Sequence, residues 1–309
     1  LWDREAKQIH FARDRFGKKP LYIGWAADTL LFASELKAFH RHPDFSAELD
    51  RHALSLYMRF GYVCAPQTIF KNVWQLLPGG RISLDAAQWR AGEDLARRME
   101  QYWSLKQCVD EARLQPVTQD EQAVIREFEE MLSRATAQRM VSDVPLGAFL
   151  SGGIDSSLVA ALMQKNSARP VKTYSIGFDN EAYDETKAAA AIAAYLGTDH
   201  HEFRVTARDA MDVVPLLPDL YDEPFADASQ IPTFLLSKLA RGHVTVALTG
   251  DGGDEILGGY DRHTKLPALW KKMSWIPSPI RKSMGALVMR VPQDGYDRLR
   301  PRHPQFGRK

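Results

Sequence analysis

The stretch Val144-Pro-Leu-Gly-Ala-Phe-Leu-Ser-Gly-Gly-Ile-Asp-Ser-Ser-Leu-Val159 is the most informative part of this chain. Apolar and small residues lead into the polar turn Ser151–Ser157, and an Ala, Leu and Met run follows, which predicts a buried strand, a tight turn and a helix. Glycines let the backbone approach an anion, and the first N–H groups of a helix point at it. Asp155 adds a carboxylate of the kind that holds Mg²⁺ beside a pyrophosphate. The stretch therefore predicts a phosphate-binding loop.

By itself the turn is also compatible with an ordinary surface turn, because Ser, Gly and Asp are common turn residues. It is not the common P-loop, since it has no G-x-x-x-x-G-K-[ST] pattern and no lysine to reach a γ-phosphate. The run Ser151-Gly152-Gly153-Ile154-Asp155-Ser156 resembles the pyrophosphate loop of ATP pyrophosphatases. This resemblance implies cleavage of ATP between its α and β phosphates, with activation of a substrate by adenylation.

Four segments after residue 118 are predicted to be strands that alternate with helices. Thr118-Gln-Asp-Glu121 is a capping box that predicts a long amphipathic helix reaching about Met140. Strands separated by helices form a parallel sheet with helices on both faces, so we expect an α/β fold. The predicted strands are residues 144–150, 171–178, 201–205 and 244–248, and the predicted helices between the later strands are 186–196, closed by Gly197, and 232–240.

Three polar motifs follow these predicted strands at their carboxyl ends, where parallel sheets bind ligands. They are Ser151–Ser157, Ser175–Gly177 and Thr249-Gly-Asp-Gly-Gly-Asp-Glu255. The last motif alone is also compatible with a surface turn. Beside the first loop, we expect Asp155 and Asp254 to bracket one metal–pyrophosphate unit.

Residues 1–85 are predicted to be strand and turn, with a short helix over 35–39 and a longer one over 50–60. Residues 86–117 are polar and weakly periodic, and we interpret them as an interdomain connection. Residues 118–309 are then the α/β domain. Because the chain opens at Leu1 inside a strand pattern and ends without a closing element, we expect it to be a piece of a longer protein, incomplete at both ends.

The bulk composition is that of a soluble globular protein, with 45% hydrophobic and 26% charged residues. Forty basic and thirty-nine acidic residues leave a net charge of +1, so electrostatics give no reason to expect binding to nucleic acid or to an anionic membrane. Two cysteines, Cys64 and Cys108, make neither a disulfide framework nor a zinc site and suit a reducing cytoplasm. No apolar run approaches the roughly 20 residues of a membrane span.

Together these motifs resemble the glutamine-hydrolysing asparagine synthetases, which join a class II glutamine amidotransferase domain to an ATP-pyrophosphatase (HUP-like) synthetase domain. The two glycine-rich loops carry the resemblance in the second half. Ala12-Arg-Asp-Arg-Phe-Gly-Lys-Lys-Pro-Leu-Tyr22 and Phe32-Ala-Ser-Glu-Leu-Lys-Ala38 carry it in the first. Residues 1–85 thus resemble the β-rich end of an N-terminal-nucleophile glutaminase domain.

The resemblance assigns a role to individual residues. It implies that Asp14 holds the ammonium group of the substrate glutamine and that Asp251 is the catalytic acid of acyl-adenylate formation. It implies that Asp155 and Asp254 bind Mg²⁺. The ATP-binding residues that it implies are Leu150, Ser151, Gly152, Gly153, Asp155, Ser156, Ile176, Thr249 and Gly250.

The implied reaction is the ATP-dependent amidation of a carboxylate, aspartate in the family, by a cytoplasmic ligase of asparagine biosynthesis that uses ATP and Mg²⁺. Two alternatives stay open: an amidotransferase acting on another carboxylate, such as a sugar acid, a peptide or a β-lactam precursor, and a non-catalytic nucleotide-binding homologue. Neither nucleic acid nor membrane is an expected partner, and a homodimer is compatible with the resemblance. The family's N-terminal cysteine nucleophile is not in this chain, which begins with Leu1.

Overall fold

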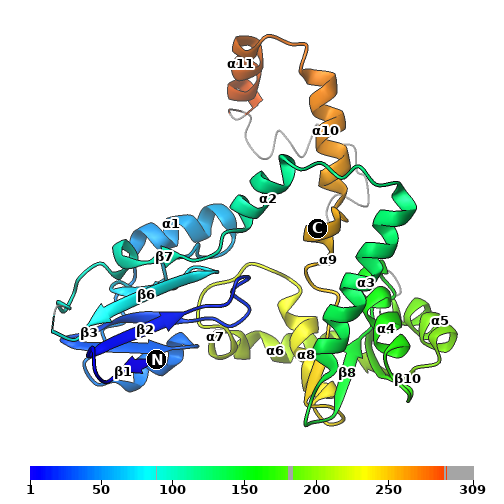
Figure 1. Ribbon diagram of the computed structural model, residues 1–309, viewed down its shortest axis with the longest axis horizontal. Coiled ribbons are helices and arrows are strands. Elements are labelled where there is room, and N and C mark those ends of the chain that lie inside the picture. Colours follow the sequence, from blue (N-terminus) through cyan, green and yellow to red (C-terminus); the bar gives the residue numbers. More distant parts are fainter. Residues whose placement is uncertain (88, 180–183, 289, 291–309) are drawn as a thin grey trace. The chain divides into compact units, whose positions relative to one another are not determined.

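The computed structural model describes residues 1–87, 89–179, 184–288 and 290 of the 309-residue chain. It divides into two compact units, Leu1–Thr249 and Gly250–Lys309. The first unit contains an antiparallel part near its N-terminus and a parallel α/β part near its C-terminus (Figure 1).

The α/β part is built on a parallel sheet whose strands are ordered β10-β9-β8-β11. The chain passes from β8 to β9 to β10 in one direction, and β11 then returns to the other side of β8. The point where the strand order reverses therefore lies between β8 and β11, which is where such sheets bind ligands. The strands are β8 (Leu146–Phe149), β9 (Lys172–Phe178), β10 (Asp199–Val205) and β11 (Val246–Leu248), so all four predicted strands are confirmed.

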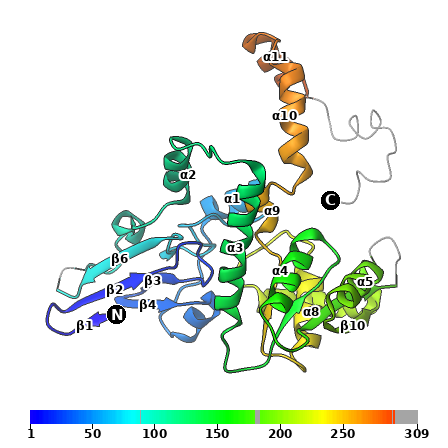
Figure 2. The same cartoon turned by 45° about the vertical axis from the view of Figure 1, so that its right-hand side comes forward.

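Helices cover both faces of this sheet, which confirms the expected α/β class. On one face Leu150 packs with Ala160 of α4 and with Ala189 and Ala193 of α5, and these two helices lie side by side (Figure 2). On the other face Tyr174 packs with Ala240 of α8, and Val205 with Val213 of α6. The helices are α4 (Ile154–Lys165), α5 (Thr186–Leu196), α6 (Ala207–Val213), η4 (Val214–Leu216), α7 (Leu217–Leu220) and α8 (Gln230–Ala240).

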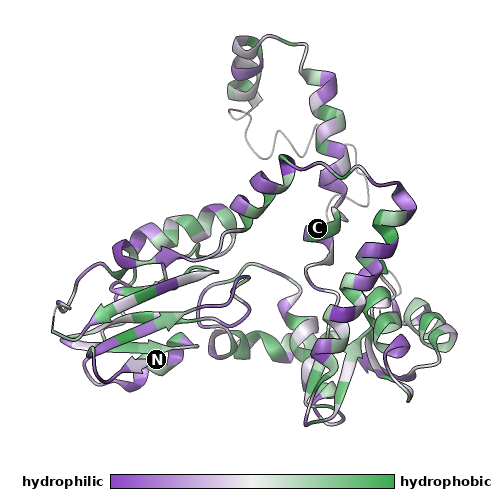
Figure 3. Ribbon diagram, in the orientation of Figure 1, coloured by the Kyte–Doolittle hydropathy of each residue, from purple (hydrophilic) through white to green (hydrophobic). Residues whose placement is uncertain are grey.

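Helix α5 shows how the sequence sets this packing. Its alanine-rich sequence makes it largely green in the hydropathy colouring of Figure 3, and its small side chains let it approach α4 closely. It ends at Gly197, which adopts the left-handed conformation with φ +70° and donates its N–H to the carbonyl of Ala193. The predicted glycine cap is therefore confirmed.

The antiparallel part consists of two sheets, ordered β1-β2-β6-β7 and β4-β3-β5. Phe11 of β2 and Ile82 of β6 share one core with Ile23 and Trp25 of β3, so the two sheets pack face to face. Tyr22 on the other face of β3 packs with η1 and α1. The elements are β1 (Trp2–Asp3), β2 (Gln8–Ala12), β3 (Tyr22–Ala26), β4 (Thr29–Ala33), η1 (Leu36–Arg41), α1 (Arg51–Phe60), β5 (Val73–Gln75), β6 (Gly80–Asp85) and β7 (Glu100–Gln101).

The segment interpreted as a connection, residues 86–117, is only partly a connection. Leu95, in η2 (Leu95–Arg98), is fully buried in the core of the antiparallel part, and the indole N–H of Trp25 donates to the carbonyl of Glu93 at 3.0 Å. By contrast, α2 (Leu105–Arg113) buries none of its residues. The domain limits at residues 85 and 117 stay predictions.

Helix α3 (Glu121–Met140) begins with a different cap from the one predicted. The capping box starting at Thr118 is wrong: Asp120 is the N-cap residue, and its carboxylate Oδ1 accepts the N–H of Ala123 at 2.9 Å. The reason is geometric, because a side chain caps a helix only from the position directly before it and bonds to an N–H two or three residues on.

Changing Asp120 to alanine is expected to lower the free energy of unfolding by about 1 kcal/mol, because the helix loses its capping acceptor. Thr118→Ala is the matched control and is expected to leave stability unchanged. Urea denaturation followed by circular dichroism measures both. Equal losses in the two variants would contradict the assignment of the cap.

The second unit is helical over the residues described. It contains α9 (Gly253–Leu257), α10 (Asp261–Met273) and α11 (Ser278–Val288), with Pro267 inside α10. The remainder of the predicted α/β domain, residues 291–309, lies outside the described residues.

Candidate functional site

The turn after β8 is held in one shape by its own serines. The Ser156 hydroxyl accepts the N–H of Ser151 at 3.2 Å and lies 3.0 Å from the Ser151 hydroxyl. The Ser151 hydroxyl accepts the N–H of Gly153 at 3.3 Å, and the Ser157 hydroxyl donates to the Gly153 carbonyl at 2.6 Å. Ser156 is buried, so the two contacts of its hydroxyl with Ser151 are partly shielded from water. The loop is therefore preorganised from residues within it.

Gly152 is the tightest point of the loop. Its φ is +82°, a conformation that favours glycine, and a Cβ built on it lies 2.8 Å from the Cβ of Ala188 in α5. Helix α5 therefore packs directly against the backbone of the loop.

The loop ends at an uncapped helix. Gly153 is the N-cap of α4 and has no side chain to bond to the first N–H groups of that helix. A helix N-terminus carries roughly half a positive charge. Asp155 lies in the first turn and Ile154 is 85% exposed, so this end of α4 is open to solvent. The arrangement suits an anion bound at the N–H groups with a cation beside the carboxylate.

Three of the predicted positions meet at one edge of the sheet. Phe149 pairs with Tyr174 and Ala148 pairs with Leu248, so Leu150 and Thr249 follow the ends of β8 and β11, and Ile176 lies two residues beyond Tyr174 inside the neighbouring β9. Leu150 is buried and donates its N–H to the Tyr174 carbonyl at 2.8 Å. Ile176 packs beside the cluster that contains Val205 and Leu235.

The second glycine-rich motif opens α9. Gly252, with φ +91°, is the N-cap of this short helix, and Gly253 donates its N–H to the Gly250 carbonyl at 3.1 Å. The Tyr260 hydroxyl donates to the Glu255 carboxylate, which lowers the pKa of Glu255. Gly250, Asp251 and Asp254 belong to the second unit, so a shared site with Asp155 stays a prediction.

Asp14 is surrounded by backbone N–H groups of its own loop. Its Oδ1 accepts from Phe16 at 3.2 Å and Lys18 at 2.9 Å, and its Oδ2 accepts from Lys19 at 3.1 Å. The N–H groups of Lys18 and Lys19 are the main cause that lowers the pKa of Asp14. The carboxylate is exposed, ionised at neutral pH and still has lone-pair capacity on Oδ2 for an ammonium group.

Arg13 holds the Asp14 loop in place through hydrogen bonds, a role that the sequence did not reveal. Its side chain is buried and donates to three carbonyls: Nε to Lys19 at 2.9 Å, Nη1 to Leu76 at 2.7 Å and Nη2 to Gly17 at 2.7 Å. A buried arginine that bonds to backbone carbonyls stabilises the segments that carry those carbonyls. The only signal in the sequence is its place beside Asp14, which does not distinguish a buried arginine from an exposed one.

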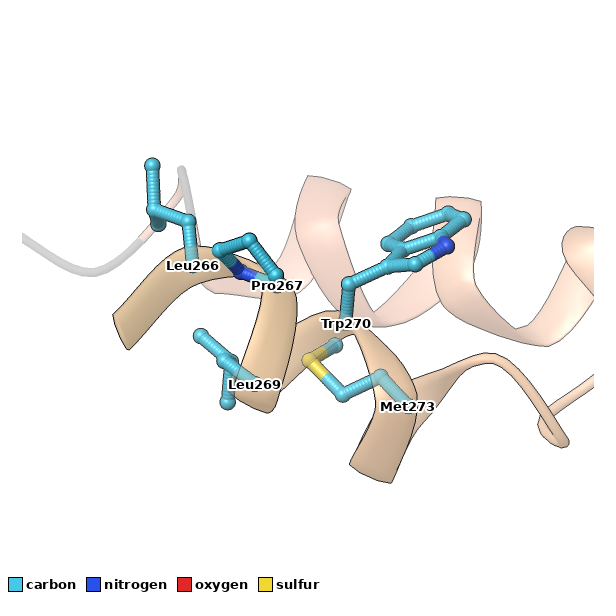
Figure 4. Close-up of a pocket in the computed structure, with 5 residues that line it drawn as sticks. All are labelled: Leu266, Pro267, Leu269, Trp270 and Met273. Atoms are coloured by element: carbon cyan, nitrogen blue, oxygen red, sulfur yellow. The ribbon is translucent and has the colours of Figure 1, made fainter. Parts of the chain in front are cut away.

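The structure has an apolar hollow on α10. It has a volume of about 460 Å³ and is lined by Leu266, Pro267, Leu269, Trp270 and Met273, all on one face of one helix (Figure 4). It is shallow and has no convergent polar groups to orient a ligand, which binding sites for small molecules need.

The described residues contain neither a cluster of metal ligands nor a helix that could span a membrane. No group of three or more His, Cys, Asp or Glu side chains is placed to hold a metal ion among them. Within the same residues, no helix has both the length and the apolar character needed to cross a bilayer.

The parallel α/β part places a glycine-rich loop and an uncapped helix where the strand order reverses, which is where such sheets bind ligands, and an antiparallel β-rich part precedes it. The family model for asparagine synthase matches residues 127–305, and the model for a glutamine amidotransferase domain matches residues 1–103. The chain belongs to the asparagine synthase family.

Curated relatives agree with this assignment. A putative glutamine-hydrolysing asparagine synthetase 2 of Methanocaldococcus jannaschii is 35% identical over 266 residues, covering 85% of this chain and 49% of the relative. The glutamine-hydrolysing asparagine synthetase 1 of Bacillus subtilis is 32% identical over 293 residues, covering 95% of this chain and 44% of the relative. The chain thus spans about half the length of the curated relatives it matches.

Among solved structures, an NH3-dependent NAD synthetase of Campylobacter jejuni is similar with a TM-score of 0.31 and 18% identity, over 44% of this chain and 60% of that one. An NMN synthetase of Francisella tularensis is similar with a TM-score of 0.33 and 16% identity, over 45% and 59%.

Proposed function

We propose that this chain provides the ATP-binding part and a portion of the glutaminase part of an enzyme that converts aspartate to asparagine with glutamine as the nitrogen donor. The observation that carries the proposal is the Ser151–Ser157 loop, which combines a preorganised backbone with the uncapped N-terminus of α4. Family membership supports the same reaction.

ATP is proposed to bind with its phosphates on the loop and the start of α4. Ser151, Gly152, Gly153 and Ser156 contribute N–H and hydroxyl groups around the phosphates. Leu150 and Ile176 border the adenine, and Thr249 with Gly250 borders the ribose. Asp155 is the proposed ligand of Mg²⁺ on the first loop and Asp254 on the second.

The chemistry of Asp155 fits a magnesium site. Mg²⁺ is typically bound through one or two carboxylates and the phosphates of its nucleotide, so it needs no cluster of three protein ligands. The carboxylate lies in the first turn of α4, on the side where the N–H groups favour an anion. When bound, Mg²⁺ neutralises charge on the leaving pyrophosphate.

In the proposed reaction, a carboxylate oxygen of aspartate attacks the α-phosphorus of ATP, and the bond to the β-phosphate oxygen breaks. This step gives aspartyl-AMP and pyrophosphate, with Asp251 as the proposed acid of the activation step. Ammonia then attacks the acyl carbon, AMP leaves with the electron pair of the acyl–oxygen bond, and the nitrogen releases one proton to give the neutral amide. The loop contributes by positioning the phosphates and stabilising the charge that develops on them.

Asp14 is proposed to hold the α-ammonium group of the glutamine that supplies the ammonia. Its low pKa keeps the carboxylate charged, and the Arg13 network fixes its loop. A different carboxylate acceptor stays the alternative, because the motifs described above concern ATP and glutamine and do not specify which carboxylate is amidated.

Two further properties belong to the proposal. A reducing cytoplasm suits the two free cysteines, Cys64 and Cys108. A homodimer is the proposed assembly.

Changing Asp155 to asparagine is expected to weaken Mg-ATP binding at least about tenfold while leaving binding of ATP in EDTA unchanged. The amide keeps the shape of the side chain but loses the charge that binds the cation. Titration calorimetry with and without Mg²⁺ measures both affinities. Asp143→Asn, at an exposed position before β8, is the matched control. Equal Mg²⁺ dependence in the two variants would rule out Asp155 as a ligand.

The reaction itself is tested on the full-length gene product, with ATP, Mg²⁺, glutamine and a panel of carboxylates. Release of pyrophosphate that requires aspartate supports the proposed function. Release of pyrophosphate with another acid but not with aspartate would assign the enzyme to the alternative substrate. Binding of ATP without any release identifies a non-catalytic homologue.

A further inference from the structure

Asp222 of the α/β part bonds to the start of a helix in the antiparallel part. It lies between α7 and α8, and its Oδ2 accepts the N–H of Leu36 at 2.6 Å. Its Oδ1 accepts the N–H of Lys37 at 3.3 Å and lies 3.5 Å from the Lys37 ammonium. Leu36 and Lys37 open η1, whose own N-cap residue Glu35 makes no side-chain cap. The capping acceptor of η1 therefore comes from a residue about 185 positions away in the sequence.

The next residue makes a second attachment. Glu223 Oε1 accepts the N–H of Ile69 at 2.7 Å, and Tyr22 lies close enough to this carboxyl group to influence its pKa. A third bond follows, from the N–H of Ala226 to the carbonyl of Gly61 at 2.8 Å. The segment 222–226 thus bonds to the antiparallel part at three separate places, which are the start of η1, Ile69 and Gly61.

Glu223 is a partly buried carboxyl group. Burial is the main cause that raises its pKa to about 7, and the charge of Asp222 acts in the same direction. The Ile69 N–H and the Tyr22 hydroxyl act in the opposite direction. Burial likewise raises the pKa of Tyr22, so its hydroxyl stays protonated. Lys37 faces Asp222, and Arg13 lies close enough to Tyr22 to influence its pKa.

We propose that Asp222 and Glu223 are positioning residues that hold the antiparallel part on the α/β part, and that the hold is strongest when Glu223 carries a proton. Asp222 supplies two carboxylate acceptors to the start of η1. Glu223 supplies an acceptor for the Ile69 N–H, and the free energy of joining varies with pH because separation returns its carboxyl group to water. This inference concerns a joint inside the chain and does not rest on the proposed reaction.

The segment 222–226 lies between elements that carry predicted site residues. On one side, α8 follows it and packs on β9, the strand that carries Ile176. On the other side, Tyr22 neighbours Arg13, which bonds to the Asp14 loop.

The sign of the pH effect follows from linkage. A carboxyl group with a raised pKa in the joined state binds a proton more tightly there, so the joint is favoured below the ordinary pKa and weakens as the pH rises through about 7. Between pH 6 and pH 8 this predicts a loss of about tenfold in the joining equilibrium. Amide hydrogen exchange at Ile69, corrected for the intrinsic effect of pH on exchange, measures this joining equilibrium. The amide of buried Ile23 is the reference for global unfolding.

Three variants separate the outcomes. Glu223→Gln keeps an acceptor for Ile69 and is expected to remove the tenfold fall, with protection at pH 8 equal to or above that of the unchanged protein. Asp222→Asn is expected to lower protection at Leu36 at every pH. Glu127→Gln, at an exposed position on α3, is the control and is expected to behave as the unchanged protein. A tenfold fall that persists in Glu223→Gln overturns the proposal, and so does a parallel fall at Ile23.

Discussion

Gly152→Ala is expected to lower the affinity for ATP at least about a hundredfold, because the phosphate-binding loop loses its shape. The new methyl group comes within 2.8 Å of the Ala188 Cβ, closer than two carbons approach without something moving. A φ of +82° adds strain for any residue with a Cβ. The loop or α5 must shift, and a displacement of about 1 Å at a binding site costs on the order of a hundredfold. Titration calorimetry with Mg-ATP measures the effect.

Gly197→Ala is the matched control for this prediction. Gly197 also has a positive φ, +70°, and lies at the other end of α5, but a Cβ there meets nothing within 4 Å. This variant carries the backbone strain without the contact, so it is expected to lose about 1 kcal/mol of stability and to bind ATP normally. If Gly152→Ala bound ATP as tightly as Gly197→Ala, the contact with α5 would not determine the shape of the loop.

Arg13→Met is expected to lower the free energy of unfolding by about 3 to 5 kcal/mol, because it removes three hydrogen bonds from a buried charge. Methionine fills much of the volume but leaves the carbonyls of Gly17, Lys19 and Leu76 without a donor. Arg13 shares its loop with Asp14, so increased hydrogen exchange is expected at the amides of Lys18 and Lys19, which Asp14 binds. Denaturation in urea measures the stability.

Arg13→Lys tests the geometric part of this argument. A single ammonium group cannot place three donors in the directions that the planar guanidinium covers, so lysine is expected to recover only a minor part of the loss. Arg15→Met, at an exposed position in the same loop, is expected to leave stability unchanged. If lysine restored the full free energy of unfolding, the positive charge, and not the arrangement of guanidinium N–H donors, would be what stabilises the loop.

The α/β part was largely predictable because its signals are local. A run of buried apolar residues, a glycine-rich turn and a helix pattern recur along the chain, and each needs only its neighbours to be interpreted. The sequence therefore predicted the four strands, the glycine cap at Gly197 and the loop after β8. The cap of α3 was wrong because Thr118 and Asp120 are both good capping residues, and only the true start of the helix distinguishes them.

The sequence by itself determined the parallel α/β class and the glycine-rich turn after β8, since side-chain type and spacing specify a strand, a turn and a helix N-terminus. The tertiary structure decided which polar residues are buried and what they bind. Arg13 bonds to Leu76, 63 positions away, and Asp222 caps a helix that starts at Leu36. Such bonds form only where segments distant in the sequence meet. The free energy of a buried charge depends on the groups that it bonds to there more than on its neighbours in the sequence. No local pattern records that information.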